Sequence, residues 1–219
     1  GLVRLLDFFE EEGFPFAVMD FVGGQSLADR VRDSGALPET QALQYIRQVG
    51  SALSVVHKHG LVHKRVKPEN LVRPAGTDFV ILVDYGILDC MPPDQSSTRP
   101  PEASNPYGAI ECDQPSAPLT PATDIYALAA TLYFLLTGQP PTPATQQEQS
   151  PLTPPRKLRS EISAAAEAAI LSGMAAKPQS RPQTIAAWFA QLPGAEQFPP
   201  VPIAPGTVLP NLQPAVAVT

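Results

Sequence analysis

The stretch that decides the fold is His-Lys-Arg-Val-Lys-Pro-Glu-Asn at residues 63–70, followed by Asp-Tyr-Gly at residues 84–86. Apolar runs at residues 61–62, 71–72 and 79–83 flank these polar residues and predict short buried strands with a polar loop between them. Functional side chains commonly lie on loops that a rigid scaffold positions. We therefore expect the chemistry of the chain to lie in this loop and in the turn after it.

Upstream of this loop, the sequence predicts a hairpin and two helices. Apolar runs at residues 2–6 and 16–19 are separated by an acidic, glycine-containing segment, which indicates two strands and a turn. Ser26 can cap a short helix. Between residues 40 and 59 apolar residues recur every three or four positions, which is the period of one buried helical face, and Gly60 supplies the stop.

Downstream of the loop, residues 123–136 are nearly all apolar, but this run is shorter than the ~20 residues that a membrane span needs. We expect a central helix that is buried on all sides. Two amphipathic helices are expected at about 161–175 and 182–192, with loops at 88–121 and 139–155. The many prolines after Pro193 predict an unpacked and partly polyproline-like tail.

The composition limits the classes of function. The chain has 219 residues, enough for one domain, and a formal net charge of −6, which argues against a nucleic-acid interface or an anionic membrane surface. Two cysteines are too few for a disulfide framework or a zinc site and fit a reducing compartment. With no secretory signal and no transmembrane segment visible, we expect a cytoplasmic protein that meets another protein as partner or substrate.

These motifs resemble serine/threonine protein kinases, whose catalytic loop reads His-Arg-Asp-Leu-Lys-Pro-Glu-Asn and whose metal-binding turn reads Asp-Phe-Gly. The stretch DIYALAATLYFLLTGQPP at 124–141 is similar to bacterial kinases and also to cyanobacterial sequences. The resemblance implies an α+β, protein-kinase-like fold. Residues 1–24 would be a remnant of the β-rich amino-terminal lobe and hinge, residues 25–193 the mainly helical carboxyl-terminal lobe, and residues 194–219 a disordered proline-rich tail.

The resemblance also implies roles for single residues, with ATP and Mg²⁺ as cofactors. Lys67 would contact the transferred phosphate, Asn70 and Asp84 would hold the metal, and Met19, Asp20, Val22 and Val72 would surround the adenine. Five further residues would be structural: His63 packed in the core, Tyr85 in the stack between lobes, Glu111 and Arg181 as an ion pair, and Asp124 as a buried helix cap that, in the family, also anchors the catalytic loop.

One departure from the family pattern concerns the chemistry directly. Arg65 stands where the family has the Asp that orients and deprotonates the attacking hydroxyl, and a guanidinium stays charged and has no acceptor lone pair. Losing such a group typically costs about 10² to 10⁴-fold in rate. Arg65 could instead pair with Asp84 and occupy the place of the metal's charge. Lys64 replaces the family's Arg. Lysine keeps the positive charge but cannot form the two parallel hydrogen bonds of a guanidinium.

Three functions follow from this pattern. The first is a pseudokinase or an inactive kinase fragment, because the base is replaced and the glycine-rich loop, the strand lysine and its glutamate partner have no counterparts. The second is an active, ATP-dependent serine/threonine kinase in its full-length form. The third is a non-catalytic module that offers proline segments to partner proteins. The chain starts inside a strand pattern, which favours a truncated sequence over a degenerate relic.

Overall fold

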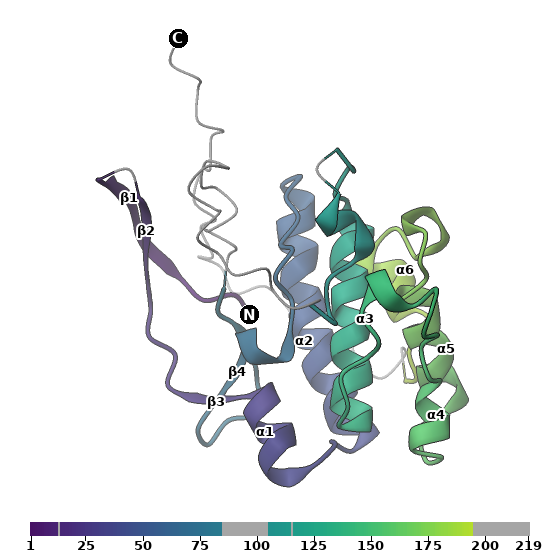
Figure 1. The fold of residues 1–219 in the computed structure, drawn as a ribbon. Helices are drawn as coiled ribbons and strands as arrows, with labels where there is room; N and C mark the ends of the chain where they lie inside the picture. Colours follow the sequence, from purple (N-terminus) through teal and green to yellow (C-terminus); the bar gives the residue numbers. More distant parts are fainter. Residues whose placement is uncertain (13, 85–104, 115, 195–219) are drawn as a thin grey trace.

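The computed structural model of the chain describes residues 1–12, 14–84, 105–114 and 116–194 (Figure 1). The predictions for Tyr85, for most of the loop at 88–121 and for the tail after residue 194 lie outside these residues. Within them, no helix combines the length and the apolar character that crossing a membrane requires.

The core of the molecule is helical. Helix α2 (Glu39–Lys58) and helix α3 (Pro121–Thr137) lie side by side (Figure 1). Helices α4 (Pro155–Leu158) and α5 (Ala164–Gly173) pack against α3, and α6 (Ile185–Phe189) contacts both α2 and α3. All residues of α3 except Pro121 and Phe134 are buried, which confirms the predicted central helix.

Local sequence signals explain where the helices begin and end. Helix α1 (Leu27–Ser34) begins at Ser26, whose side chain accepts a hydrogen bond from the backbone N–H of Asp29, so the predicted cap is confirmed. Helix α2 ends just before Gly60, which has φ +73° and takes the left-handed conformation that glycine adopts without strain. Helix α3 begins with a capping box formed by Thr120 and Thr123.

The strands form two separate sheets. Strands β1 (Leu5–Glu11) and β2 (Phe14–Met19) make the predicted antiparallel hairpin. Strands β3 (Gly24–Ser26), β4 (Leu71–Pro74) and β5 (Ile81–Leu82) form a three-stranded sheet in the order β3-β4-β5.

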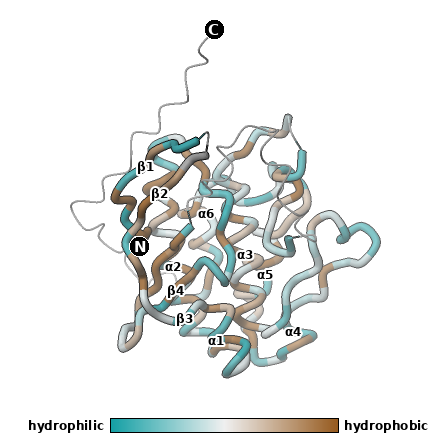
Figure 2. The backbone as a smooth tube through the Cα atoms, turned by 60° about the vertical axis from the view of Figure 1, so that its left-hand side comes forward, coloured by the Kyte–Doolittle hydropathy of each residue, from teal (hydrophilic) through white to brown (hydrophobic). Residues whose placement is uncertain are grey.

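The hairpin stands out from the helical core and carries apolar side chains that are about half exposed. Hydrophobic residues run along both of its strands (Figure 2). Five of them are between 40% and 52% exposed: Leu6, Phe8, Phe9, Phe16 and Val18. The rings of Phe9 and Phe16 stack on each other with their centroids 5.4 Å apart.

Several predicted boundaries are wrong. Residues 61–62 form no strand, because the backbone N–H of Leu61 bonds back to Val56 and completes the end of α2. The run at 79–83 contributes only the two residues of β5, and Phe79 is 47% exposed. The helices expected at 161–175 and 182–192 are shorter, and α4 was not predicted.

Candidate active site

The loop at 63–70 is fastened to the helical core by Asp124. This carboxylate is fully buried in the first turns of α3 and accepts hydrogen bonds from the backbone N–H groups of His63 and Lys64, each at 2.8 Å. It also lies 2.8 Å from Nε2 of His57, at the end of α2. The interpretation of Asp124 as a helix cap is therefore corrected: Thr120 caps α3, and Asp124 holds the loop.

The backbone of the loop is strained where Asp124 holds it. Lys64 has φ +69°, in the left-handed region that residues with a side chain rarely adopt. Such strain persists where the surroundings over-determine the conformation. Here the two hydrogen bonds from consecutive N–H groups to one buried carboxylate fix the turn.

Asn70 links the predicted base position to the predicted metal ligand. Its Nδ2 donates hydrogen bonds to the backbone oxygen of Arg65 at 2.9 Å and to Oδ2 of Asp84 at 3.2 Å. A short 3-10 turn, η1 (Pro68–Asn70), positions the amide, and the backbone N–H of Val83 bonds to the oxygen of Asn70 at 3.0 Å. The structure therefore brings Arg65, Asn70 and Asp84 together.

Whether Mg²⁺ fits beside Asn70 and Asp84 depends on the oxygen ligands that these residues can offer. Among the described residues there is no group of three or more His, Cys, Asp or Glu that could hold a metal. Asn70 and Asp84 offer one amide oxygen and one carboxylate, and Mg²⁺ commonly takes only one or two protein oxygens when nucleotide phosphates and waters supply the rest. The pair thus fits Mg²⁺ that arrives with a nucleotide, but not a metal site made of protein alone.

His63 is a packed residue whose environment keeps it neutral. Its side chain is buried, and Nδ1 accepts a hydrogen bond from the backbone N–H of Arg65 at 3.4 Å. Burial lowers the pKa of His63; the charges of Asp124 and Asp84 raise it, the charge of Arg65 lowers it, and the net shift is downward. The charges of Asp84 and Arg65 thus act on the same imidazole in opposite directions.

The residues predicted to surround adenine line one pocket. Met19, Asp20, Val22 and Val72 all face a cavity of about 410 Å³ that also includes Val83. Its walls are mostly apolar, which suits the face of a planar base. The carboxylate of Asp20 is turned to Arg4, whose Nε lies 3.0 Å from it, so the side chain of Asp20 is engaged at the surface.

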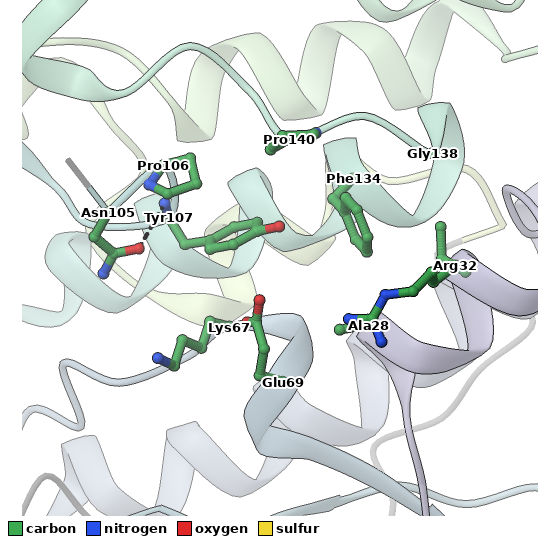
Figure 3. A pocket seen from close by; sticks show the side chains of 11 residues that line it. Ala28, Arg32, Lys67, Glu69, Asn105, Pro106, Tyr107, Phe134, Gly138 and Pro140 are labelled. Atoms are coloured by element: carbon green, nitrogen blue, oxygen red, sulfur yellow. Dashed lines mark hydrogen bonds between the residues drawn. The ribbon is translucent and has the colours of Figure 1, made fainter. Parts of the chain in front are cut away.

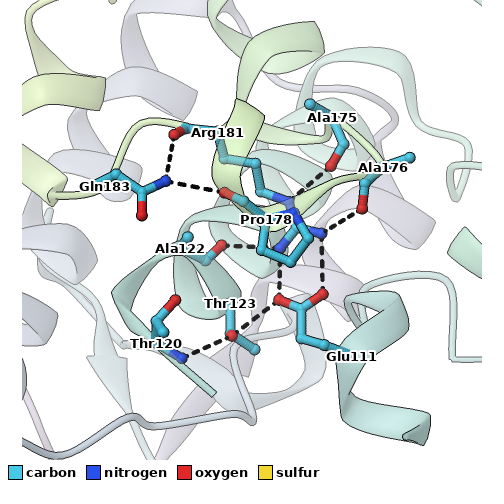
Figure 4. Close-up of polar contacts among 9 residues, drawn as sticks. All are labelled: Glu111, Thr120, Ala122, Thr123, Ala175, Ala176, Pro178, Arg181 and Gln183. Atoms are coloured by element: carbon cyan, nitrogen blue, oxygen red, sulfur yellow. Dashed lines mark hydrogen bonds and ion pairs between the residues drawn. The ribbon is translucent and has the colours of Figure 1, made fainter. Parts of the chain in front are cut away.

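Glu111 and Arg181 form a buried, bidentate ion pair away from the loop (Figure 4). Nη1 of Arg181 lies 2.6 Å from Oε1 of Glu111, and Nη2 lies 3.0 Å from Oε2. The hydroxyl of Thr123 donates to the same carboxylate, and the guanidinium lies 4.9 Å from the centre of the Tyr126 ring. Burial raises the pKa of Glu111, but the bonds and charge of Arg181 outweigh it and the net shift is downward. The pair joins the segment before α3 to the segment before α6.

A second pocket, of about 560 Å³, lies between α1, the 67–69 turn and the end of α3 (Figure 3). Lys67 faces it together with Glu69, Tyr107 and Phe134. No local sequence pattern indicates this pocket, because its walls come from segments that are far apart in the chain. The contact of His57 with Asp124 was missed for the same reason.

Comparisons with known proteins agree with this geometry. The protein kinase domain family matches residues 1–188. Serine/threonine-protein kinase PknE of Mycobacterium tuberculosis is 34% identical over 190 residues, which cover 82% of this chain and 33% of that protein. The kinase domain of M. tuberculosis PknI has a similar fold, with a TM-score of 0.69 at 24% identity over 85% of this chain and 68% of that one.

The structure of Rad53 in complex with AMP-PNP is similar with a TM-score of 0.66 at 26% identity, over 85% of this chain and 48% of that chain. The chain spans only 30% to 33% of the length of the curated relatives PknB and PknE. The family match nevertheless covers most of the chain, and the loop, the turn and the buried ion pair lie in the order that the family requires. The chain therefore belongs to the protein kinase family, among the serine/threonine kinases of bacteria.

Proposed function

We propose that this chain is a pseudokinase-like module, which keeps the kinase fold but transfers phosphate very poorly or not at all. The observation that carries the proposal is Arg65. The backbone oxygen of Arg65 accepts a hydrogen bond from Asn70, which supports the assignment of Arg65 to the place where the family has its catalytic Asp. A guanidinium cannot accept the hydroxyl proton at any ordinary pH. The loss is therefore chemical rather than a failure of the loop to fold.

The same geometry supports weak nucleotide binding. The pocket of Met19, Asp20, Val22 and Val72 would take the adenine, and Asn70 and Asp84 would face Mg²⁺ carried on the phosphates. The metal, when bound, neutralises phosphate charge. The charges of Arg65 and Asp84 both act on the imidazole of His63, and the guanidinium of Arg65 would compete with the metal for Asp84. This competition predicts that Arg65→Asp raises affinity for magnesium-ATP, measured as a larger nucleotide-induced shift in melting temperature than in the parent chain.

A transfer assay tests the proposal directly. The chain, Arg65→Asp and Asp84→Asn are incubated with magnesium, γ-labelled ATP and a general protein substrate. We expect the parent chain to incorporate no more label than Asp84→Asn, which removes the metal carboxylate. Incorporation by the parent chain that Asp84→Asn abolishes would contradict the proposal and favour an active kinase.

A second candidate function is an active serine/threonine kinase in a longer natural protein, since Lys67, Asn70 and Asp84 are all present. Protein partners or substrates and a cytoplasmic location belong to both candidates. The two are distinguished by repeating the label assay on the longer protein with the same Asp84→Asn control.

A further inference from the structure

Strand β1 has one edge that no described strand covers. It pairs with β2 along its other edge, and the two strands make up a sheet of their own that stands apart from the helical core (Figure 1). The backbone N–H of Phe8 donates to the carboxylate of the neighbouring Asp7 at 2.8 Å. Backbone groups along the edge of a sheet can form hydrogen bonds with a strand from another chain. The outer edge of β1 can therefore accept an additional strand.

The side chains on one face of the hairpin determine which strand would fit. In the register of the hairpin Phe9 lies opposite Phe16, and Asp7 lies opposite Val18. Because side chains alternate between the two faces of a sheet, these four side chains share one face with Glu11. Along β1, this face presents an exposed aromatic ring with an exposed carboxylate two positions away on each side.

The carboxylates of β1 have no countercharge among the described residues. Asp7, Glu10 and Glu11 each lie more than 4.0 Å from every described basic group. Arg4, just before the strand, is paired with Asp20, with its Nε 3.0 Å from the carboxylate. Opposite charges in facing positions of neighbouring strands attract. An added strand with basic residues opposite Asp7 and Glu11 would therefore supply the missing countercharge.

Two other occupants of this edge do not match its charge. If two copies of the chain paired β1 with β1 in antiparallel fashion about Phe9, Asp7 of each copy would face Glu11 of the other. Like charges in facing positions destabilise a sheet. Residues 195–219 contain no basic residue, so they bring no cation to the edge either. The charge pattern favours a basic segment of a different protein.

We infer that the free edge of β1 binds an extended segment of a protein partner, in which one apolar residue has a basic residue two positions away on each side. The apolar residue lies beside Phe9, and the basic residues lie opposite Asp7 and Glu11. These three residues of β1 line neither of the two pockets. The inference therefore goes beyond the proposed function and does not depend on nucleotide binding or on phosphoryl transfer.

A titration with two peptides tests the role of charge. One peptide has blocked ends and the core Lys-Thr-Val-Thr-Lys, and the other is the same peptide with both lysines acetylated, which removes their charges. Each is added to the isotope-labelled chain without nucleotide, and backbone NMR resonances are followed. We expect the lysine peptide to shift the amide resonances of residues 5–11, and the acetylated peptide to bind about three- to tenfold more weakly. Equal binding of the two peptides would overturn the inference.

Methylation of the peptide backbone tests strand addition itself. The N–H groups of alternate residues in a strand point to opposite sides, so only one set would face β1. N-methylation of the valine and N-methylation of both threonines block opposite edges of the lysine peptide. We expect one of these two modifications to abolish the shifts and the other to leave them. If both methylated peptides bind like the parent peptide, attraction by charge alone explains the binding and strand addition is wrong.

Matched double variants locate the charge on the protein. Asp7→Asn combined with Glu11→Gln should weaken binding of the lysine peptide about three- to tenfold. Asp113→Asn combined with Glu148→Gln removes the same net charge from exposed positions outside the hairpin and should leave the affinity unchanged. Equal weakening by the two double variants, shifts confined to other regions, or no binding of the lysine peptide would each contradict the inference.

Spectra of the chain without peptide test the two other occupants. Shifts of the β1 amides that grow with protein concentration would assign the edge to a second copy. Nuclear Overhauser contacts between these amides and residues 195–219 would assign it to that segment. Either result would overturn the inference of a basic partner, whereas β1 resonances that are independent of concentration and free of such contacts support it.

Discussion

At the scale of single residues, the buried imidazole of His63 links the loop to solution pH. Its pKa is lowered by burial in the folded chain, whereas in the unfolded chain it titrates near 6.5. Below pH 6.5 the unfolded state binds a proton at this histidine that the folded state does not bind. The free energy of unfolding should therefore fall as the pH drops from 6.5 toward the folded pKa, and the contribution of His63 should be fully present above pH 6.5.

Urea unfolding at several pH values checks this expectation. His63→Leu should flatten the decline in unfolding free energy below pH 6.5, because the titrating group is gone. His59→Leu, which removes an exposed histidine, should keep the parent slope. Equal slopes for the parent chain and His63→Leu would show that folding does not shift this group.

The proximity of predicted site residues, though not their roles, was predictable where few elements separate them. Arg65, Asn70 and Asp84 meet because a short turn and one strand pairing separate them. The partnership of His57 with Asp124 joins residues 67 positions apart and depends on how α2 packs against α3. No local pattern encodes that register, so the residues alone indicated only a cap at Asp124, whereas the family resemblance correctly implied that Asp124 anchors the loop.

At the scale of elements, long helices were predictable and short strands were not. Helix α2 repeats one apolar pattern over several turns, so its period is unambiguous, and α3 is a continuous apolar run that is too long for a typical strand. An apolar pair such as residues 61–62 carries no period. Apolar character alone predicts a strand there, whereas the hydrogen bond from the backbone N–H of Leu61 to the oxygen of Val56 makes the pair the end of a helix.

The packing of α5 on α3 depends on the absence of a side chain at Gly173. A Cβ there would lie 2.6 Å from Cβ of Ala129 and 3.0 Å from Nε1 of Trp188. Alanine favours a helix over glycine by about 1 kcal/mol, but overpacking a core costs about 1–3 kcal/mol. We expect Gly173→Ala to lower the unfolding free energy, measured by urea denaturation.

A double-mutant cycle with Ala129→Gly separates the two effects. Removing the opposing methyl should make Gly173→Ala less harmful than it is alone, because the two methyl groups compete for one space. Additive effects of the two substitutions would place the cost of Gly173→Ala elsewhere.

At the scale of the whole molecule, the chain consists of a close-packed helical core and a hairpin that is only thinly attached. A two-stranded sheet alone is marginally stable in water, and the large side chains of β1 and β2 are substantially exposed. We expect the amides of the hairpin to exchange with deuterium much faster than those of α3, as followed by mass spectrometry. Equal protection of both regions would show that they unfold as one unit.

The fold class was predictable from the sequence because the motifs occur in a fixed order, and the family match over residues 1–188 confirms it. The division into two sheets was not. Strand β3 pairs with β4, which lies nearly fifty residues further along the chain. Gly24 has no apolar side chain that could indicate a strand in the sequence. Glycine is needed there because a Cβ would collide with the backbone carbonyl of Arg73.

The triple engagement of Asp124 has a consequence for mutational surveys. One carboxylate holds two consecutive amides of the loop and a histidine from another helix, so its replacement would release a strained bend and loosen the interior together. A screen that scores only loss of ligand recognition would rank this position beside groups that touch the ligand. A measurement of the melting temperature run in parallel would show that the residue stabilises the fold.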